Sequence, residues 1–110
     1  MSFEVEEIQG FTVVRLVGEI DLRNSPQARK QILTQLKKKK DVMVDLSGVE
    51  YIDSSGIASL VEGFQYARNN GREFGLLGVS AFAMNVLRLA RLDKVFRIYD
   101  SLEDRIAHGT

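Results

Sequence analysis

The spacing of apolar positions changes several times along the chain and predicts the order of its secondary structure. Residues 3–8 and 11–17 are rich in apolar and β-branched residues and flank Gln9-Gly10, which predicts a β-hairpin whose second strand ends at Gly18. Residues 42–46 form an apolar run, typical of a central strand that is covered on both faces. Beyond Gly56, apolar residues recur at the spacing of an amphipathic helix.

The other segments continue this alternation of strands and helices. Asn24 or Ser25 followed by Pro26 predicts the start of a helix that ends in the lysine run 37–40. The remaining predictions are a strand over 74–78, a helix capped by Ser80, an edge strand over 95–99 and a last helix with a capping box over 101–104. Alternation from residue 11 onward implies right-handed crossovers. We therefore predict one α/β domain over residues 1–110, with about four helices and a mixed, mostly parallel sheet whose first strand is antiparallel.

Composition and charge exclude several classes of function. The chain has 110 residues, 45% of them hydrophobic, and a formal net charge of zero. A neutral chain has no overall field to attract nucleic acid, so we expect no direct binding of DNA or RNA. The run Lys37-Lys38-Lys39-Lys40 is the local exception, and we interpret it as solvated cations that compensate a helix dipole.

Two absences narrow the chemistry further. The sequence contains no cysteine, which excludes disulfides, thiolate catalysis and cysteine-based metal sites, and we expect neither a metal nor another cofactor. No apolar run approaches the roughly 20 residues that span a bilayer. The first residues are acidic, unlike a signal peptide. We therefore expect a cytoplasmic protein that does not associate with membranes.

The candidate functional site is the segment Asp53-Ser54-Ser55-Gly56, where the predicted central strand passes into a helix. The first backbone N–H groups of a helix have no partner within it. Such an end favours negative charge, including that of a phosphate. The alternative is that Asp53 or Ser54 only caps the helix.

Four motifs, in this order, carry a resemblance to a known family. They are Gly-Glu-Ile-Asp at 18–21, Val-Asp-Leu-Ser at 44–47, Tyr-Ile-Asp-Ser-Ser-Gly-Ile at 51–57 and Gly-Arg-Glu-Phe-Gly-Leu-Leu-Gly-Val-Ser at 71–80. With the opening pair of strands before them, the match extends over nearly the whole chain, which resembles the anti-sigma factor antagonists of the STAS domain family. The resemblance implies a STAS-like fold and assigns Ser54 as the phosphorylated residue. It also implies that Asp21 and Asp53 are the acidic neighbours of Ser54, and that Ser55 and Gly56 complete the motif.

The resemblance also implies a partner and a cycle. The partner is an anti-sigma factor that is also a serine kinase and carries the ATP. The unphosphorylated antagonist binds this kinase and frees the sigma factor, phosphorylation separates the pair, and a serine phosphatase resets the switch. A phosphate adds about −1.5 to −2 charges, which Asp53 and Asp21 would repel, so we expect a local electrostatic change without refolding.

Three alternatives compete with this switch. A serine hydrolase needs a base near Ser54 or Ser55, and the only histidine, His108, lies two residues from the end of the sequence. A phosphoreceiver built on Asp45 lacks the acidic pair and the lysine that such proteins need, and we expect Asp45 to fix the turn after its strand. We therefore expect no catalysis. The third alternative stays open: a STAS adaptor subunit of a transporter complex that is never phosphorylated.

Two further expectations concern the third helix. Phe82 and Met84, near its start, are candidates for an exposed apolar rim. At its end Arg91 occupies a place where the family commonly has glycine. If the backbone there is left-handed in the family, a non-glycine residue costs roughly 1 kcal/mol or more, so we expect the turn to be rebuilt.

Overall fold

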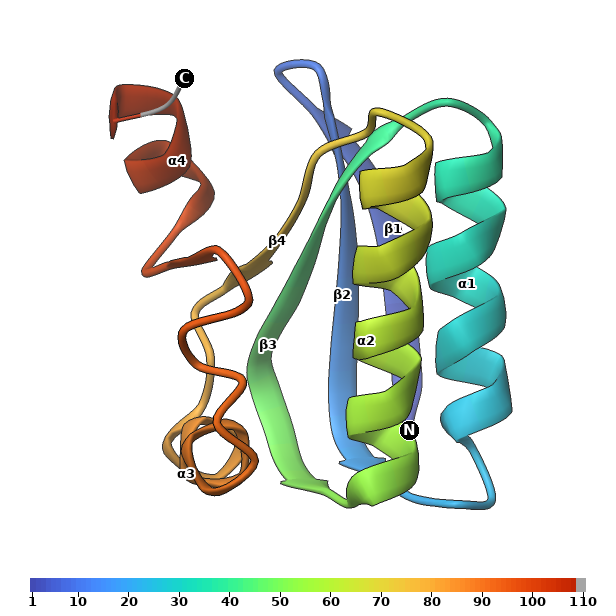
Figure 1. Ribbon diagram of the computed structural model, residues 1–110, viewed down its shortest axis with the longest axis vertical. Helices are drawn as coiled ribbons and strands as arrows, with labels where there is room; N and C mark the ends of the chain where they lie inside the picture. Colours follow the sequence, from blue (N-terminus) through green and yellow to red (C-terminus); the bar gives the residue numbers. More distant parts are fainter. Residues whose placement is uncertain (109–110) are drawn as a thin grey trace.

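Strands β1 to β5 form one mixed sheet in the order β1-β2-β3-β4-β5 (Figure 1). The structure is a computed structural model that describes residues 1–108. Strand β1 runs antiparallel to β2, and every other neighbouring pair is parallel. The strands are β1 (Ser2–Ile8), β2 (Phe11–Ile20), β3 (Asp41–Ile52), β4 (Phe74–Leu77) and β5 (Ile98–Tyr99). The predicted hairpin and the mostly parallel sheet are confirmed.

Four helices in residues 1–108 cover this sheet, as predicted. They are α1 (Ser25–Lys37), α2 (Ser54–Asn69), α3 (Ala81–Leu89) and α4 (Leu102–His108). Helices α1 and α2 lie side by side, whereas α3 and α4 lie on the other side of β3 in the same view (Figure 1). Pro26 stands in the first turn of α1, where its missing N–H has no consequence.

The alternating side chains of β3 explain why the sheet needs cover on both faces. Val44 packs with the apolar residues of α1 and α2, among them Ile32 and Leu60, in the larger buried cluster. Met43 points to the opposite face and packs in a smaller cluster with Leu102, the first residue of α4. Successive side chains of a strand face opposite ways, so a run of apolar residues requires partners on both faces.

The central strand is longer than the sequence predicted. Strand β3 continues past Leu46 to Ile52, and β2 continues past Gly18 to Ile20. Their pairing shifts register between Arg15 and Val17 and again between Gly18 and Glu19. A Cβ atom on Gly48 would lie 3.1 Å from Val17 Cγ2, so the glycine leaves room for the Val17 side chain of the paired strand.

The predicted edge strand over 95–99 is wrong in its first half. Only Ile98–Tyr99 pair with β4, whereas the N–H groups of Val95 and Phe96 both donate to the carbonyl of Leu92 in a turn. The Phe96 ring is buried against Phe64, at 5.6 Å between ring centroids. Phe96 is apolar because it fills the core from a loop, which the alternation of residue types does not distinguish from a strand.

Helix α3 ends in a left-handed turn, although a non-glycine residue occupies the left-handed position, so the expected change of turn geometry is absent. Arg91 is left-handed, with φ of 59°. The N–H of Arg91 donates to the carbonyl of Arg88 at 3.0 Å, and the N–H of Leu92 donates to the carbonyl of Leu87 at 2.8 Å. These two bonds define a Schellman motif, in which glycine is the usual residue at the left-handed position.

Candidate functional site

The ends of β2 and β3 bring two carboxylates to one edge of the sheet. Ile20 pairs with Ile52, and the N–H of Asp53 donates to the carbonyl of Ile20 at 3.2 Å. Asp21 and Asp53 therefore leave neighbouring parallel strands at the same level. This is the carboxyl edge of the sheet, where sites of α/β proteins commonly form. Helix α2 begins at the next residue, Ser54 (Figure 1).

Asp53 is the N-cap of α2. Its Oδ1 accepts hydrogen bonds from the backbone N–H groups of Ser55 at 2.9 Å and Gly56 at 3.2 Å, and from the Ser55 hydroxyl at 2.5 Å. The hydroxyl bond is the main cause that lowers the pKa of the Asp53 carboxyl, while the nearby Asp21 carboxylate acts in the opposite direction. The cap uses the Asp53 carboxylate and leaves the Ser54 hydroxyl outside this network.

The two serines of the motif have different surroundings. Ser55 is half-buried, and its hydroxyl donates to Asp53. Ser54 is exposed, and none of the hydrogen bonds found within residues 1–108 involves its hydroxyl. Ser54 is the first residue of α2, so it stands where backbone N–H groups lack helical partners. An accessible hydroxyl at the positive end of a helix dipole suits the acceptance of an anionic group.

Asp21 is held in place by a residue that the sequence analysis did not single out. Arg23 Nη2 lies 2.7 Å from Asp21 Oδ2, and the backbone N–H of Arg23 donates to Asp21 Oδ1 at 3.0 Å. The Arg23 guanidinium lowers the pKa of the Asp21 carboxyl. The spacing Asp-x-Arg after a strand was the available indication of this pair. The negative charge beside Ser54 is therefore partly balanced by an exposed cation.

Gly56 is required by the close approach of α2 to the strand ends. A Cβ atom there would lie 2.6 Å from Ile52 Cγ1 and 3.1 Å from the Ile20 carbonyl oxygen. A side chain at this position would push α2 away from β2 and β3. The glycine thus keeps Ser54 and Asp53 in their places at the sheet edge.

Asp45 has a structural role, as expected, but it acts inside β3 and not at a turn after the strand. Its Oδ1 accepts hydrogen bonds from the backbone N–H of Ser47 at 2.8 Å and from the Ser47 hydroxyl at 2.7 Å, and its Oδ2 accepts from Arg15 Nε at 3.2 Å. Ser47 lies where the pairing of β2 and β3 changes register. Asp45 therefore fixes the irregular backbone inside β3, in place of a turn after it.

Segments at this edge of the sheet carry exposed apolar side chains. The Leu22 residue, between Asp21 and Arg23, is 75% exposed. Phe82 is exposed as predicted, and its ring lies 5.4 Å from that of Tyr51, the residue three positions before Ser54. Met84 is half-buried, so it is less exposed than expected and contributes less to this rim. Leu22 and Tyr51 were not singled out from the sequence, although an apolar residue between two charged ones was a visible indication of Leu22.

No general base in residues 1–108 accompanies Ser54 in the manner of a serine hydrolase. His108 ends α4, at the opposite end of the molecule from the start of α2 (Figure 1). The described residues contain no group of three or more side chains that could hold a metal ion. Nor does any helix among them have the length and apolarity needed to cross a membrane.

Comparison with known proteins gives this arrangement a family. The STAS domain model matches residues 2–105. The chain belongs to the STAS domain family. A curated relative, the anti-sigma F factor antagonist of Paenibacillus polymyxa, is 25% identical over 103 residues, covering 92% of this chain and 88% of the relative.

Solved structures share the fold. An anti-sigma factor antagonist from Mycobacterium paratuberculosis has a TM-score of 0.86 at 27% identity, over 96% of this chain and 91% of that one. A putative anti-sigma factor antagonist from Thermotoga maritima has a TM-score of 0.87 at 24% identity, over 96% and 92%. A sulfate transporter family protein from Wolinella succinogenes also has this fold, with a TM-score of 0.76 at 18% identity over 92% and 85%. The fold alone therefore does not choose between a switch and a transporter subunit.

Proposed function

We propose that this STAS domain is an anti-sigma factor antagonist controlled by phosphorylation of Ser54. In its unphosphorylated form it binds an anti-sigma factor, which then releases its sigma factor. The observation that carries this proposal is the difference between the two serines. The Ser55 hydroxyl donates a hydrogen bond to the Asp53 cap, whereas Ser54 is exposed. The names of the curated relatives support the same class of partner.

The chemistry of the switch requires no catalytic group from this chain. The partner is a serine kinase that carries the ATP. The Ser54 oxygen attacks the γ-phosphorus, the bond to the β-phosphate oxygen breaks, ADP leaves, and the hydroxyl proton passes to a base of the kinase. A serine phosphatase later hydrolyses the ester with water and restores the hydroxyl. Both reactions take place in the cytoplasm, where the sigma factor acts.

A phosphate at Ser54 changes the surface without moving the fold. The start of α2 tolerates the new charge because the helix dipole favours anions there, while the N–H groups of Ser55 and Gly56 stay with Asp53. Asp53 and Asp21 are ionised neighbours and only Asp21 is paired with a cation, Arg23, so the modified surface is strongly negative. A partner that presents acidic or apolar groups to the exposed Leu22 would meet this charge at close range. A penalty of about 3 kcal/mol corresponds to a loss of more than a hundredfold in affinity.

The experiment uses the protein, its anti-sigma factor kinase and ATP, with mass spectrometry of tryptic peptides. We expect one phosphate on Ser54, none on the Ser54→Ala variant, and normal modification of the matched Ser55→Ala variant. Unmodified protein and Ser54→Ala should bind the kinase equally, whereas Ser54→Asp should bind at least tenfold more weakly. Modification of Ser55 alone would refute the assignment of Ser54, and modification of neither serine would refute the switch and favour the transporter adaptor.

A further inference from the structure

Strand β1 forms one edge of the sheet, and its outer side is open. Within residues 1–108 it pairs only with β2, in one uninterrupted register from Ser2 to Ile8. In Figure 1 it runs from the N-terminus to the hairpin, with no further strand beside it. An edge strand presents backbone N–H and C=O groups that can pair with an added strand.

The geometry of the hairpin turn decides which of these backbone groups are free. The turn consists of Gln9-Gly10, with φ of 50° and 87°, between the paired residues Ile8 and Phe11. A two-residue turn of this type closes on a hydrogen-bonded pair, and such pairs then alternate along an antiparallel ladder. The residues of β1 whose backbone groups point away from β2 are therefore Phe3, Val5 and Glu7. No hydrogen bond found outside the ladders of residues 1–108 occupies these groups.

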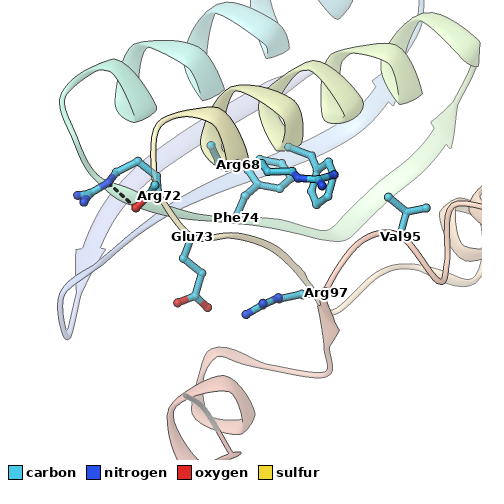
Figure 2. Close-up of a pocket in the computed structure, with 9 residues that line it drawn as sticks. Arg68, Arg72, Glu73, Phe74, Val95 and Arg97 are labelled. Atoms are coloured by element: carbon cyan, nitrogen blue, oxygen red, sulfur yellow. Dashed lines mark hydrogen bonds between the residues drawn. The ribbon is translucent and has the colours of Figure 1, made fainter.

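The opposite edge of the sheet is protected in ways that β1 is not. Strand β5 is only two residues long, and Tyr99 packs in one apolar cluster with Leu102 of α4. Helix α4 is tied to the sheet by Arg105, which binds both carboxylate oxygens of Glu73, and Figure 2 shows Glu73 pointing toward α4. Short length, cover by another element, proline and bulges are usual protections of an edge. Strand β1 is seven residues long and contains neither a proline nor a bulge.

The charge on β1 is negative along its length. Residues 2–8 contain three glutamates and neither a lysine nor an arginine. Glu4 and Glu6 are exposed and, two residues apart in a strand, point to the same face. Glu6 forms no ion pair within residues 1–108, and Glu4 lies 3.5 Å from Arg15, whose Nε is hydrogen-bonded to Asp45. A cationic partner would neutralise this pair of like charges.

The same charges argue against a second copy of the chain on this edge. Two β1 strands pairing antiparallel around Val5 would place Glu4 of each copy opposite Glu6 of the other. Like charges directly opposite each other destabilise a pair of strands. Val5 lies between the glutamates, points to the other face and is 39% exposed. The strand that fits this edge therefore has a basic, an apolar and a basic residue in succession.

We propose that the outer edge of β1 binds an extended segment of a partner protein in which lysine or arginine alternates with apolar residues. The segment adds an antiparallel strand, the more stable pairing per residue, through the free backbone groups of β1. Its basic side chains lie against Glu4 and Glu6, and the apolar residue between them lies beside Val5. This surface does not depend on phosphorylation of Ser54.

The test is an NMR titration of the ¹⁵N-labelled protein with the peptide acetyl-Thr-Lys-Val-Lys-Val-Lys-Thr-amide. We expect saturable binding with a Kd on the order of 1 mM, given the shortness of the probe. The amides of Phe3, Val5 and Glu7 should shift most, whereas those of Glu4 and Glu6 already pair with β2 and should shift less. The peptide with glutamate in place of each lysine should bind at least about tenfold more weakly, because like charges then face each other.

Two N-methylated peptides separate strand addition from charge attraction alone. Methylation of both valine nitrogens removes the N–H groups that would bond with β1 and should abolish the saturable shifts. Methylation of two lysine nitrogens, which face away from β1, should change the Kd by no more than about threefold. Equal binding of the valine-methylated peptide and the parent peptide would overturn the proposal, because charge alone would then explain the affinity.

Variants assign the binding to the glutamates. The double variant Glu4→Gln, Glu6→Gln should weaken binding of the lysine peptide about fivefold. Glu50→Gln, at an exposed glutamate of β3, should leave it unchanged. The proposal is wrong if the shifts do not saturate or if the double variant binds normally. A dimer of the protein alone in sedimentation, with the outward amides of β1 protected from exchange, would also overturn it in favour of a second copy. None of these measurements involves the kinase, so a failure here leaves the proposed switch untouched.

Discussion

The Ser55 hydroxyl donates a hydrogen bond to Asp53 Oδ1, with 2.5 Å between the oxygens. The hydroxyls of the two adjacent serines therefore differ: that of Ser55 is part of the helix cap, and that of Ser54 is available. The same carboxylate oxygen also accepts the N–H groups of Ser55 and Gly56 and so closes the first turn of α2. Ser54 takes no part in this network.

The first prediction compares the stability of the two serine variants. Ser55→Ala removes a hydrogen bond to an ionised carboxylate and should lower Tm by about 4 °C. Ser54→Ala changes an exposed hydroxyl and should shift Tm by no more than about 1 °C. Calorimetry at pH 7 measures both. Equal shifts would show that the Ser55 bond contributes nothing to stability.

The second prediction concerns Gly56. Gly56→Ala places a methyl group 3.1 Å from the Ile20 carbonyl and 2.6 Å from Ile52 Cγ1. Overpacking at a buried contact exceeds the gain in helix propensity, so the free energy of unfolding should fall by about 1–2 kcal/mol. The control is Ala58→Ser, exposed in the same helix, with a change of about 0.5 kcal/mol. Urea denaturation measures the free energy of unfolding of both variants. An unchanged or higher value for Gly56→Ala would contradict the packing argument.

The third prediction uses the strained end of α3. Arg91→Gly removes the left-handed strain of a non-glycine residue, and it should stabilise the protein by about 0.5–1 kcal/mol after the entropy of glycine in the unfolded chain is included. Arg88→Gly removes the same charge from a helical position and should destabilise by about 1 kcal/mol. Changes of opposite sign in urea denaturation are expected. Destabilisation by both variants would mean that Arg91 makes a compensating contact.

The fourth prediction concerns how the stability of the fold depends on pH. The pKa of Asp53 is lowered in the folded state, mainly by the Ser55 hydroxyl, and that of Asp21 is lowered by Arg23. The unfolded chain therefore binds these protons more readily, so their contribution is complete above about pH 4 and is lost as the pH falls through the folded-state values. Asp53→Asn can still cap α2 but does not titrate. Its Tm should consequently fall less between pH 5 and pH 2.5 than that of the parent, and parallel curves would contradict this linkage.

The sequence was a good guide to elements that have a local physical cause. Pro26 marked the first turn of α1, and the apolar spacing after Gly56 marked α2. It was a poor guide to the segment around Phe96, because burial of an aromatic ring in a loop and in a strand leaves the same pattern of residues. The extension of β3 beyond Leu46 depended on the neighbouring β2, whose register shifts cannot be seen in one strand alone.

The sequence by itself determined the family, the α/β order of elements and the position of the candidate site at Asp53-Ser54-Ser55-Gly56. Ordered motifs and the residue preferences of a helix start are local properties of the sequence. That Ser54 is the phosphorylated residue stays a prediction. Only the tertiary structure decided which serine hydroxyl is free, that Arg23 balances Asp21, and that Asp21 and Asp53 come to one edge of the sheet. The last of these depends on the pairing of strands remote in the chain, which packing sets and residue order does not.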